Sequence, residues 1–98
     1  MEKRTPHAPL RRVKALLVDG KVRTTVSALI GAAEMGLDFA DMVKLVSALV
    51  PGNFYKSMTT HADHRIWQDV YRVGTEAGEV YLKLTVIDDV LIVSFKEA

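Results

Sequence analysis

Two apolar runs, Val80–Val86 and Val90–Phe95, constrain the fold more than any other part of the chain. In the first run apolar and polar side chains alternate, which is the period of a strand with one buried and one open face. The second run is rich in β-branched residues, and Asp88 and Asp89 between the runs are typical turn formers. The sequence therefore predicts an antiparallel hairpin over residues 79–96.

A two-residue turn at Asp88 and Asp89 would fix the register of this hairpin. Ile87 then faces Val90, so the numbers of paired residues sum to 177. One face would be apolar, with the pairs Leu82–Phe95, Leu84–Val93 and Val86–Leu91. The other face would pair Thr85–Ile92, Lys83–Ser94 and Tyr81–Lys96. This second face could be a solvated outer surface with an incidental contact between Tyr81 and Lys96. It could also be a chemical site, because this pair places a phenol directly opposite an ammonium group.

The length of 98 residues allows one domain over residues 1–98, and 49% hydrophobic residues are enough for a real core. The chain has no cysteine, which excludes disulfides and thiolate metal sites. No run approaches the roughly 20 apolar residues of a membrane span, and none resembles a signal peptide. We expect a cytoplasmic protein that does not bind a membrane.

Positive charge is concentrated at the start of the chain. Residues 1–23 hold seven of the thirteen Lys and Arg residues and two acidic ones, a net +5, whereas the remainder has six basic and ten acidic residues, a net −4. Such a basic segment is typical of a surface for nucleic acid or for an acidic protein segment. It is also a common means of keeping a terminal segment soluble.

Three helices are predicted in the first half of the chain. The first covers about 9–19, from Pro9 to the stop at Gly20, and the second begins at a Thr24 or Thr25 cap and closes at Gly36. Asp38 is expected to cap the third, whose apolar stripe runs to Val50 before Pro51 ends it. Residues 21–23 are too few to classify, but suit a short edge strand.

The second half of the chain has the period of strands. Residues 53–60 and 65–71 are rich in aromatic, Thr and β-branched residues. A three-residue loop at 61–63 would place Lys56 opposite Gln68. Residues 74–78 are expected to form a turn or loop that leads into the final hairpin. Together the elements predict an α+β fold, with N-terminal helices packed on a mainly antiparallel C-terminal sheet.

Most familiar catalytic patterns are absent. His61 and His64 could suggest a metal site, but no nearby residue supplies a clear third ligand. The acidic pairs Asp88–Asp89 and Asp38–Asp41 each have a turn or cap explanation. The sequence contains no glycine-rich phosphate loop and no serine elbow. We therefore expect no metal and no cofactor.

Four residues remain, one on each of four predicted strands: Lys56, Gln68, Tyr81 and Lys96. If the two hairpins adjoin, these side chains gather on one polar surface whose charge suits a phosphodiester. Lys and Tyr ordinarily have pKa values of about 10.4 and 10, but crowding of two ammonium groups favours loss of a proton from one of them. Such a site could cleave RNA without histidine or metal.

The chain resembles the MqsR family over nearly its whole length. The segments that carry the resemblance are 1–7, 22–25, 36–39, 54–60, 66–71, 80–83 and 90–97. MqsR proteins are toxins of type II toxin-antitoxin pairs with a RelE-like fold. The resemblance implies a ribosome-independent endoribonuclease that cleaves mRNA at GC-containing triplets such as GCU and is neutralised by the antitoxin MqsA. It also implies that Lys56, Gln68, Tyr81 and Lys96 are the catalytic residues.

These residues suggest a mechanism in which a ribose 2′-hydroxyl attacks the adjacent phosphate. Lys56 would be base or phosphate clamp, Tyr81 the proton donor to the leaving oxygen, Lys96 the stabiliser of phosphorane charge and Gln68 a positioner, although these roles can be permuted. The alternative is a non-catalytic module that binds RNA or an antitoxin. Complex formation with an antitoxin and transcriptional autoregulation through that complex is compatible with either reading.

Overall fold

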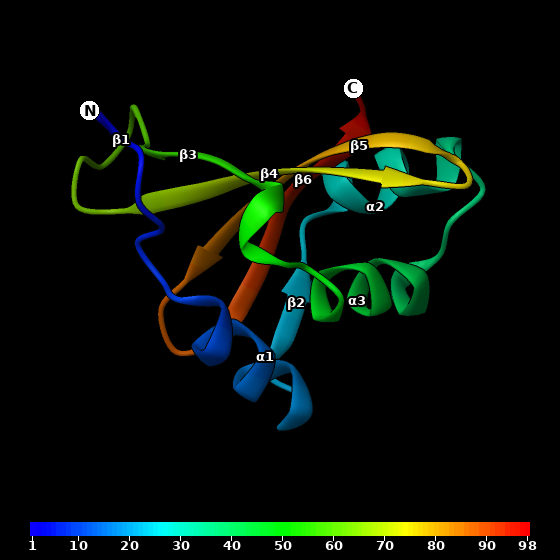
Figure 1. Cartoon of the computed structure of the whole chain (residues 1–98), viewed down its shortest axis with the longest axis horizontal. Coiled ribbons are helices and arrows are strands. Elements are labelled where there is room, and N and C mark those ends of the chain that lie inside the picture. The colour runs from blue at the N-terminus through cyan, green and yellow to red at the C-terminus, as the bar shows by residue number, and fades with distance from the viewer.

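The computed structural model describes residues 1–98 and has the predicted α+β fold, with three helices on one side of a six-stranded sheet (Figure 1). The helices are α1 (Leu10–Val18), α2 (Val26–Glu34) and α3 (Phe39–Ser47), with a 3₁₀ turn at Pro51–Asn53. The strands are β1 (Glu2–Lys3), β2 (Val22–Thr24), β3 (Phe54–Thr59), β4 (Trp67–Thr75), β5 (Gly78–Val86) and β6 (Val90–Glu97). Their spatial order is β1-β3-β4-β5-β6-β2. No helix is long and apolar enough to cross a membrane.

The starts of α2 and α3 lie where the capping residues predicted them, whereas α3 ends at Ser47, three residues before the predicted end at Val50. Thr25 Oγ1 accepts a hydrogen bond from the Ala28 N–H at 3.0 Å, which satisfies one free donor at the start of α2. Asp38 and Asp41 form a reciprocal capping box at the start of α3, with distances of 2.8 and 3.0 Å. Gly36 has a φ of +78° after α2, in the left-handed region that suits a helix stop. The three predicted helices are therefore confirmed.

A close approach of α2 to β6 explains the glycine inside this helix. A Cβ at Gly31 would lie 1.8 Å from the carbonyl oxygen of Phe95, so no larger residue fits without movement of backbone. Ala28 and Ala32, on the same side of α2, are completely buried. The cost of a mid-helix glycine is therefore offset by backbone-to-backbone packing against the sheet.

The final hairpin keeps the predicted register only in the half that is farther from its turn. Pairs from Val80–Glu97 to Lys83–Ser94 sum to 177, but a bulge follows and Val86 pairs with Val90 instead of Leu91. The connection is therefore the three residues 87–89, and the two-residue turn was wrong. Because the bulge shifts β6 by one residue, Ile92 is buried while Leu91 and Val93 are only half-buried.

The hairpin of β3 and β4 also differs from the prediction. Lys56 pairs with Val70, and Gln68 pairs with Met58, so the predicted Lys56–Gln68 pair was wrong. The reason is a longer loop, closed by a hydrogen bond from the Thr60 N–H to the Ile66 carbonyl at 3.0 Å. The predicted loop of 61–63 was too short by two residues, but an even shift keeps both side chains on one face.

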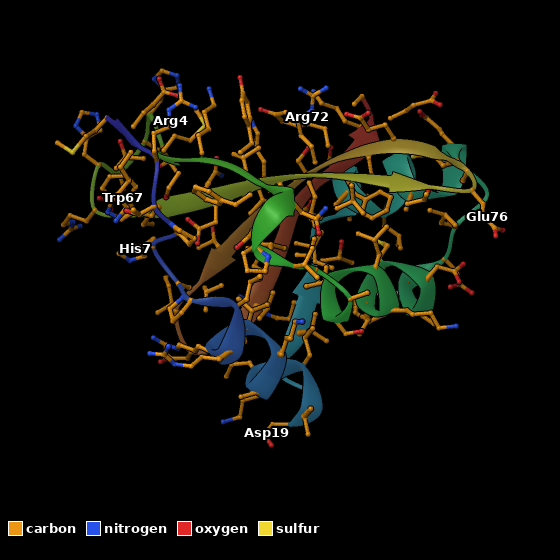
Figure 2. The ribbon with its side chains drawn as sticks, viewed as in Figure 1. Arg4, His7, Asp19, Trp67, Arg72 and Glu76 are labelled. Carbon is orange, nitrogen blue, oxygen red and sulfur yellow. The ribbon has the colours of Figure 1, made fainter.

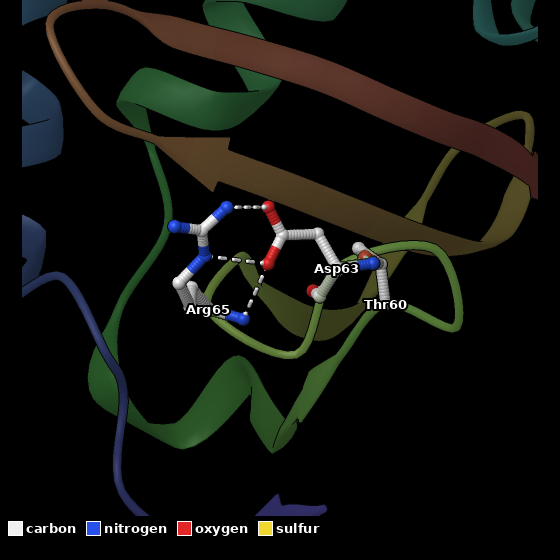
Figure 3. Close-up of polar contacts among 3 residues, drawn as sticks. All are labelled: Thr60, Asp63 and Arg65. Carbon is white, nitrogen blue, oxygen red and sulfur yellow. Dashed lines mark hydrogen bonds and ion pairs between the residues drawn. The ribbon is translucent and has the colours of Figure 1, made fainter.

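Asp63 organises this longer loop (Figure 3). The Asp63 N–H donates to Thr60 Oγ1 at 3.0 Å, and Thr60 Oγ1 donates to the Asp63 carbonyl at 2.8 Å. The Asp63 carboxylate accepts from the Arg65 backbone N–H at 2.9 Å and from both arms of its guanidinium at 3.0 and 3.1 Å. This local pairing lowers the pKa of the Asp63 carboxyl, the Arg65 hydrogen bond being the largest cause. Asp63 is thus engaged in the loop rather than available as a metal ligand.

Residues 74–78 are not the predicted loop. β4 continues through Gly74 to Thr75, which pairs with Gly78, and only Glu76 and Ala77 form the turn. Gly78 has a φ of +123°, a conformation that glycine adopts without strain. Figure 2 shows Glu76 at the tip of this hairpin.

Two short strands close the edges of the sheet. The strand β2 pairs with β6 in parallel, which confirms the suggested edge strand at residues 21–23, displaced by one residue. The strand β1 pairs with β3 through Glu2 and Lys3 and was not predicted, because two residues carry no periodic signal. Short edge strands offer little backbone for pairing with other chains.

The segment after β1 is tied to the sheet by Asp69. The backbone N–H groups of His7 and Ala8 donate to its two carboxylate oxygens at 2.9 and 3.0 Å, and Asp69 is 3% exposed. The His7 ring stacks on Trp67, with centroids 5.6 Å apart, and Figure 2 shows the two rings together. This carboxylate therefore anchors the basic N-terminal segment beside β4.

Replacing Asp69 with Ala is expected to reduce the free energy of unfolding by roughly 2–4 kcal/mol, since two backbone donors lose a charged acceptor. Urea unfolding followed by circular dichroism measures this change. The fluorescence of Trp67, the single tryptophan, should also change as His7 leaves its ring. Asp88→Ala, at an exposed position, is the matched control and should unfold at the wild-type urea concentration. Equal midpoints for the two variants would contradict the anchoring role.

Candidate active site

The face of the sheet turned away from the helices carries the candidate site. In Figure 2, Arg72 projects from this face, on the side opposite to α1 and α3. Arg72 pairs with Tyr81, and Tyr81 pairs with Lys96, so three side chains form one row across β4, β5 and β6. The Lys96 Nζ lies 5.8 Å from the centroid of the Tyr81 ring. The predicted Tyr81–Lys96 pair is confirmed, and a second cation flanks the same phenol.

The next row along the sheet contains Lys56, Val70, Lys83 and Ser94 as successive cross-strand neighbours. Val70 is completely buried, yet it does not belong to the core beneath the sheet. Its neighbours on this face are Lys56 and Lys83, whose aliphatic stems can shield an apolar side chain while the ammonium groups stay in solvent. The row that contains Lys56 and Lys83 therefore lies directly beside the row that contains Tyr81.

A β-bulge in β3 sets the positions of Tyr55 and Lys56. Phe54 pairs with Tyr71, but Lys56 pairs with Val70, so two steps on β3 match one step on β4. Phe54 packs edge-on against the Tyr71 ring below the sheet, with centroids 5.7 Å apart. The extra residue lets both Tyr55 and Lys56 project from the outer face, where strict alternation would allow only one.

These rows surround a shallow hollow of about 550 Å³. It is lined by Tyr55, Lys56, Arg72, Tyr81, Lys83, Lys96, Glu97 and Ala98. Three of the four predicted site residues, Lys56, Tyr81 and Lys96, therefore meet at one place. Sequence reasoning missed Arg72, because the predicted strand stopped at residue 71, and Tyr55, because no sequence pattern indicated the bulge.

Gln68 lies on the same face but not in this hollow. It lines a neighbouring depression of about 300 Å³, together with Thr60, Ile66 and Thr85 among others. Gln68 is four residues along β4 from Arg72, the partner of Tyr81, which corresponds to about 13 Å at the rise of a strand. The expectation that all four side chains could hold one phosphate was therefore wrong for Gln68.

Two of the four cations at the hollow are paired with carboxylates. The Lys56 Nζ lies 2.8 Å from Glu2 Oε1, and an Arg72 nitrogen lies 2.8 Å from Glu79 Oε1. Lys83 and Lys96 form no ion pair. The hollow thus offers two uncompensated ammonium groups and a third whose partner, Glu2, belongs to the short edge strand β1.

The structure distinguishes between the two roles that the sequence left open for Lys56. Its hydrogen bond to Glu2 raises the pKa of Lys56 above the ordinary value, whereas crowding of Lys56 and Lys96 was expected to favour loss of a proton from one of the two. The same contact lowers the pKa of Glu2. Lys56 is therefore an ammonium at neutral pH, which suits it to bind an anion and not to act as a base.

His61 and His64 were the histidine pair considered as a metal site from the sequence. His61 and His64 line a further hollow of about 260 Å³ with Met1, Glu2 and Lys56, among other residues. The structure brings together no group of three His, Cys, Asp or Glu residues that could hold an ion.

Fold and site together define a small α+β protein with a cationic sheet face built around a phenol, a surface suited to phosphodiester anions. The family described as "Motility quorum-sensing regulator, toxin of MqsA" matches residues 5–97. The chain is also 62% identical over 97 residues to the mRNA interferase toxin MqsR of Escherichia coli (strain K12), covering 99% of both chains. The chain belongs to the MqsR toxin family, which confirms the resemblance.

Proposed function

We propose that this chain is the toxin of a type II toxin-antitoxin pair and an endoribonuclease that cleaves single-stranded mRNA. The observation that carries the proposal is the phenol of Tyr81 between two cations, beside a third cation at Lys56. The similar E. coli protein is named an mRNA interferase toxin, and the family description names MqsA. From the family we further propose cleavage at GC-containing triplets such as GCU, independence of the ribosome, and neutralisation by an MqsA-type antitoxin.

The first step of the proposed mechanism is binding of the scissile phosphate at the lysines. The Lys56 ammonium exchanges its contact with Glu2 for a phosphate oxygen, an exchange of one anion for another that needs no change in protonation. Lys96, which has no competing carboxylate, stabilises the negative charge that builds on the phosphorane. Binding to both lysines fixes the phosphorus above the row of Tyr81.

The chemical step is attack of the ribose 2′-hydroxyl on this phosphorus. As the bond from the 2′-oxygen to phosphorus forms, the 2′-hydroxyl proton passes to solvent water, and Tyr81 donates its phenolic proton to the departing 5′-oxygen. The neighbouring Lys96 and Arg72 stabilise the phenolate, which then takes a proton back from solvent. The products are a 2′,3′-cyclic phosphate and a 5′-hydroxyl end. Gln68, about 13 Å along the sheet, is assigned to positioning a more distant nucleotide rather than the scissile one.

Incubation of the purified protein with one defined RNA, followed by mapping of both new ends, tests this proposal. We expect cleavage with excess EDTA at a rate within about twofold of that without it, because the proposed steps use only lysine, tyrosine and arginine side chains. Loss of cleavage on chelation would contradict the metal-free mechanism. RNA that is retarded on a gel but keeps its length would instead support a non-catalytic binding module.

A further inference from the structure

Tyr55 has a position that the proposed chemistry does not explain. Tyr55 is 41% exposed on the open face of the sheet, beside Tyr81, and the two rings meet edge-on with centroids 6.3 Å apart. It is placed there by the bulge in β3, which interrupts the ladder between Phe54 and Lys56. Bulges beside active sites commonly redirect a side chain toward the ligand.

Cations from three separate segments converge on the Tyr55 ring. Its centroid lies 5.4 Å from the Lys56 Nζ, 5.9 Å from the Arg4 guanidinium carbon and 5.9 Å from that of Arg72. Each such contact at an exposed site contributes only about 0.5–1 kcal/mol, and the three cations repel one another. Stability alone is therefore a weak reason for this cluster, whereas a ligand with both a flat apolar ring and an anionic group would satisfy all of its members.

We propose that Tyr55 is the stacking platform for a nucleobase of the nucleotide next to the scissile phosphate, with Arg4 contacting the phosphate on the far side of that nucleotide. The inference rests on the proposed RNA cleavage and assigns its first base subsite. Aromatic side chains beside a positively charged groove are the usual means of holding single-stranded nucleic acid, because every base offers a flat face. Arg4 lies in the basic N-terminal segment and forms no ion pair, and its side chain makes one long hydrogen bond of 3.5 Å to the Tyr55 carbonyl, so it can still bind a phosphate.

The other aromatic cluster of this region does not compete for the role. Trp67 has the His7 ring stacked on it, 16° from parallel, and the Lys3 Nζ 4.1 Å from its centroid. Those contacts already occupy the indole and hold the N-terminal segment in place. Among the aromatic rings of the outer face, Tyr55 is the one that borders the hollow and is still substantially exposed.

Binding of a short RNA that carries 2′-deoxyribose at the scissile position measures the subsite without cleavage. We expect Tyr55→Leu to raise Kd roughly 5- to 150-fold, the loss of one stacked base, and Tyr55→Phe to bind like wild type. The effect of Tyr55→Leu should disappear when one nucleotide next to the scissile position is replaced by an abasic ribose. On cleavable RNA, Tyr55→Leu should raise KM more than it lowers kcat.

Four outcomes would overturn the inference. These are unchanged binding by Tyr55→Leu, equal weakening by Tyr55→Phe, a Tyr55→Leu effect that persists with every abasic RNA, and weakening of antitoxin capture without weakening of RNA binding. The proposed function would fail only if the wild-type protein left all-ribose RNA uncut. This result can be told apart from the four outcomes above, because it does not depend on any Tyr55 variant. Circular dichroism of each variant confirms that the fold is retained.

Discussion

Tyr81→Phe is expected to slow cleavage of a defined RNA by about 10²- to 10⁴-fold, the usual contribution of a positioned proton donor. The substitution removes one oxygen and keeps the ring, so the contact with Lys96 across β5 and β6 remains. RNA binding should change little, because the phosphate is held by Lys56 and Lys96. Single-turnover rates at saturating protein measure the chemical step directly, and a fully active Tyr81→Phe protein would remove Tyr81 from the mechanism.

Tyr71→Phe is the matched control for that experiment. The Tyr71 hydroxyl is buried below the sheet with no hydrogen-bond partner, and burial raises the pKa of its phenol. Removing this hydroxyl leaves no partner unsatisfied, so stability should stay the same or rise slightly, and cleavage should be unchanged. Lys56→Ala should also abolish cleavage, but through loss of RNA binding. Measuring both RNA binding and cleavage therefore distinguishes the phosphate-binding role of Lys56 from the proton-donating role of Tyr81.

Gly31→Ala is expected to have the largest effect on stability. The new methyl group would lie 1.8 Å from the carbonyl oxygen of Phe95, and neither backbone can move without displacing α2 from β6. We expect the free energy of unfolding to fall by about 3–5 kcal/mol, which corresponds to a Tm lower by more than about 12 °C for a domain of this size. Thermal unfolding followed by circular dichroism measures the change.

Gly52→Ala tests whether the effect at Gly31 comes from the packing. A Cβ at Gly52 would meet no atom within 4 Å, and this glycine does not have a positive φ. The variant should therefore unfold at the wild-type temperature or slightly above it. If both alanine variants retain the wild-type Tm, the close approach of α2 to β6 is not a constraint on stability.

Those features of the fold that depend on a few neighbouring residues were predictable from the sequence. Thr25 and Asp38 satisfy free backbone donors within three residues of themselves, so they mark the helix starts wherever the helices later pack. The registers depended instead on loop length and on bulges. Asp63 closes its loop through hydrogen bonds to Thr60 and Arg65, and no periodicity in the flanking strands reveals the number of loop residues.

Only part of the candidate site was predicted correctly, because its geometry also depends on loop lengths and bulges. Tyr81 and Lys96 pair beyond the bulge of β6, where an error at the turn and the extra bulge residue cancel, so the predicted contact is correct. Gln68 was misplaced because its register came from the loop of β3 and β4. The contact of Glu2 with Lys56 was not predictable, since it requires pairing of a two-residue strand with a segment more than 50 residues away.

The position of β6 in the fold determines when, during synthesis, the protein can first become active. This strand follows every other element along the chain, and it alone pairs with β2, packs against Gly31 of α2 and carries Lys96. A growing polypeptide that has not yet added this strand has an incomplete core and lacks one wall of the phosphate site. We therefore expect a nascent chain to have no cleavage activity until the residues of β6 have been synthesised and have joined the sheet.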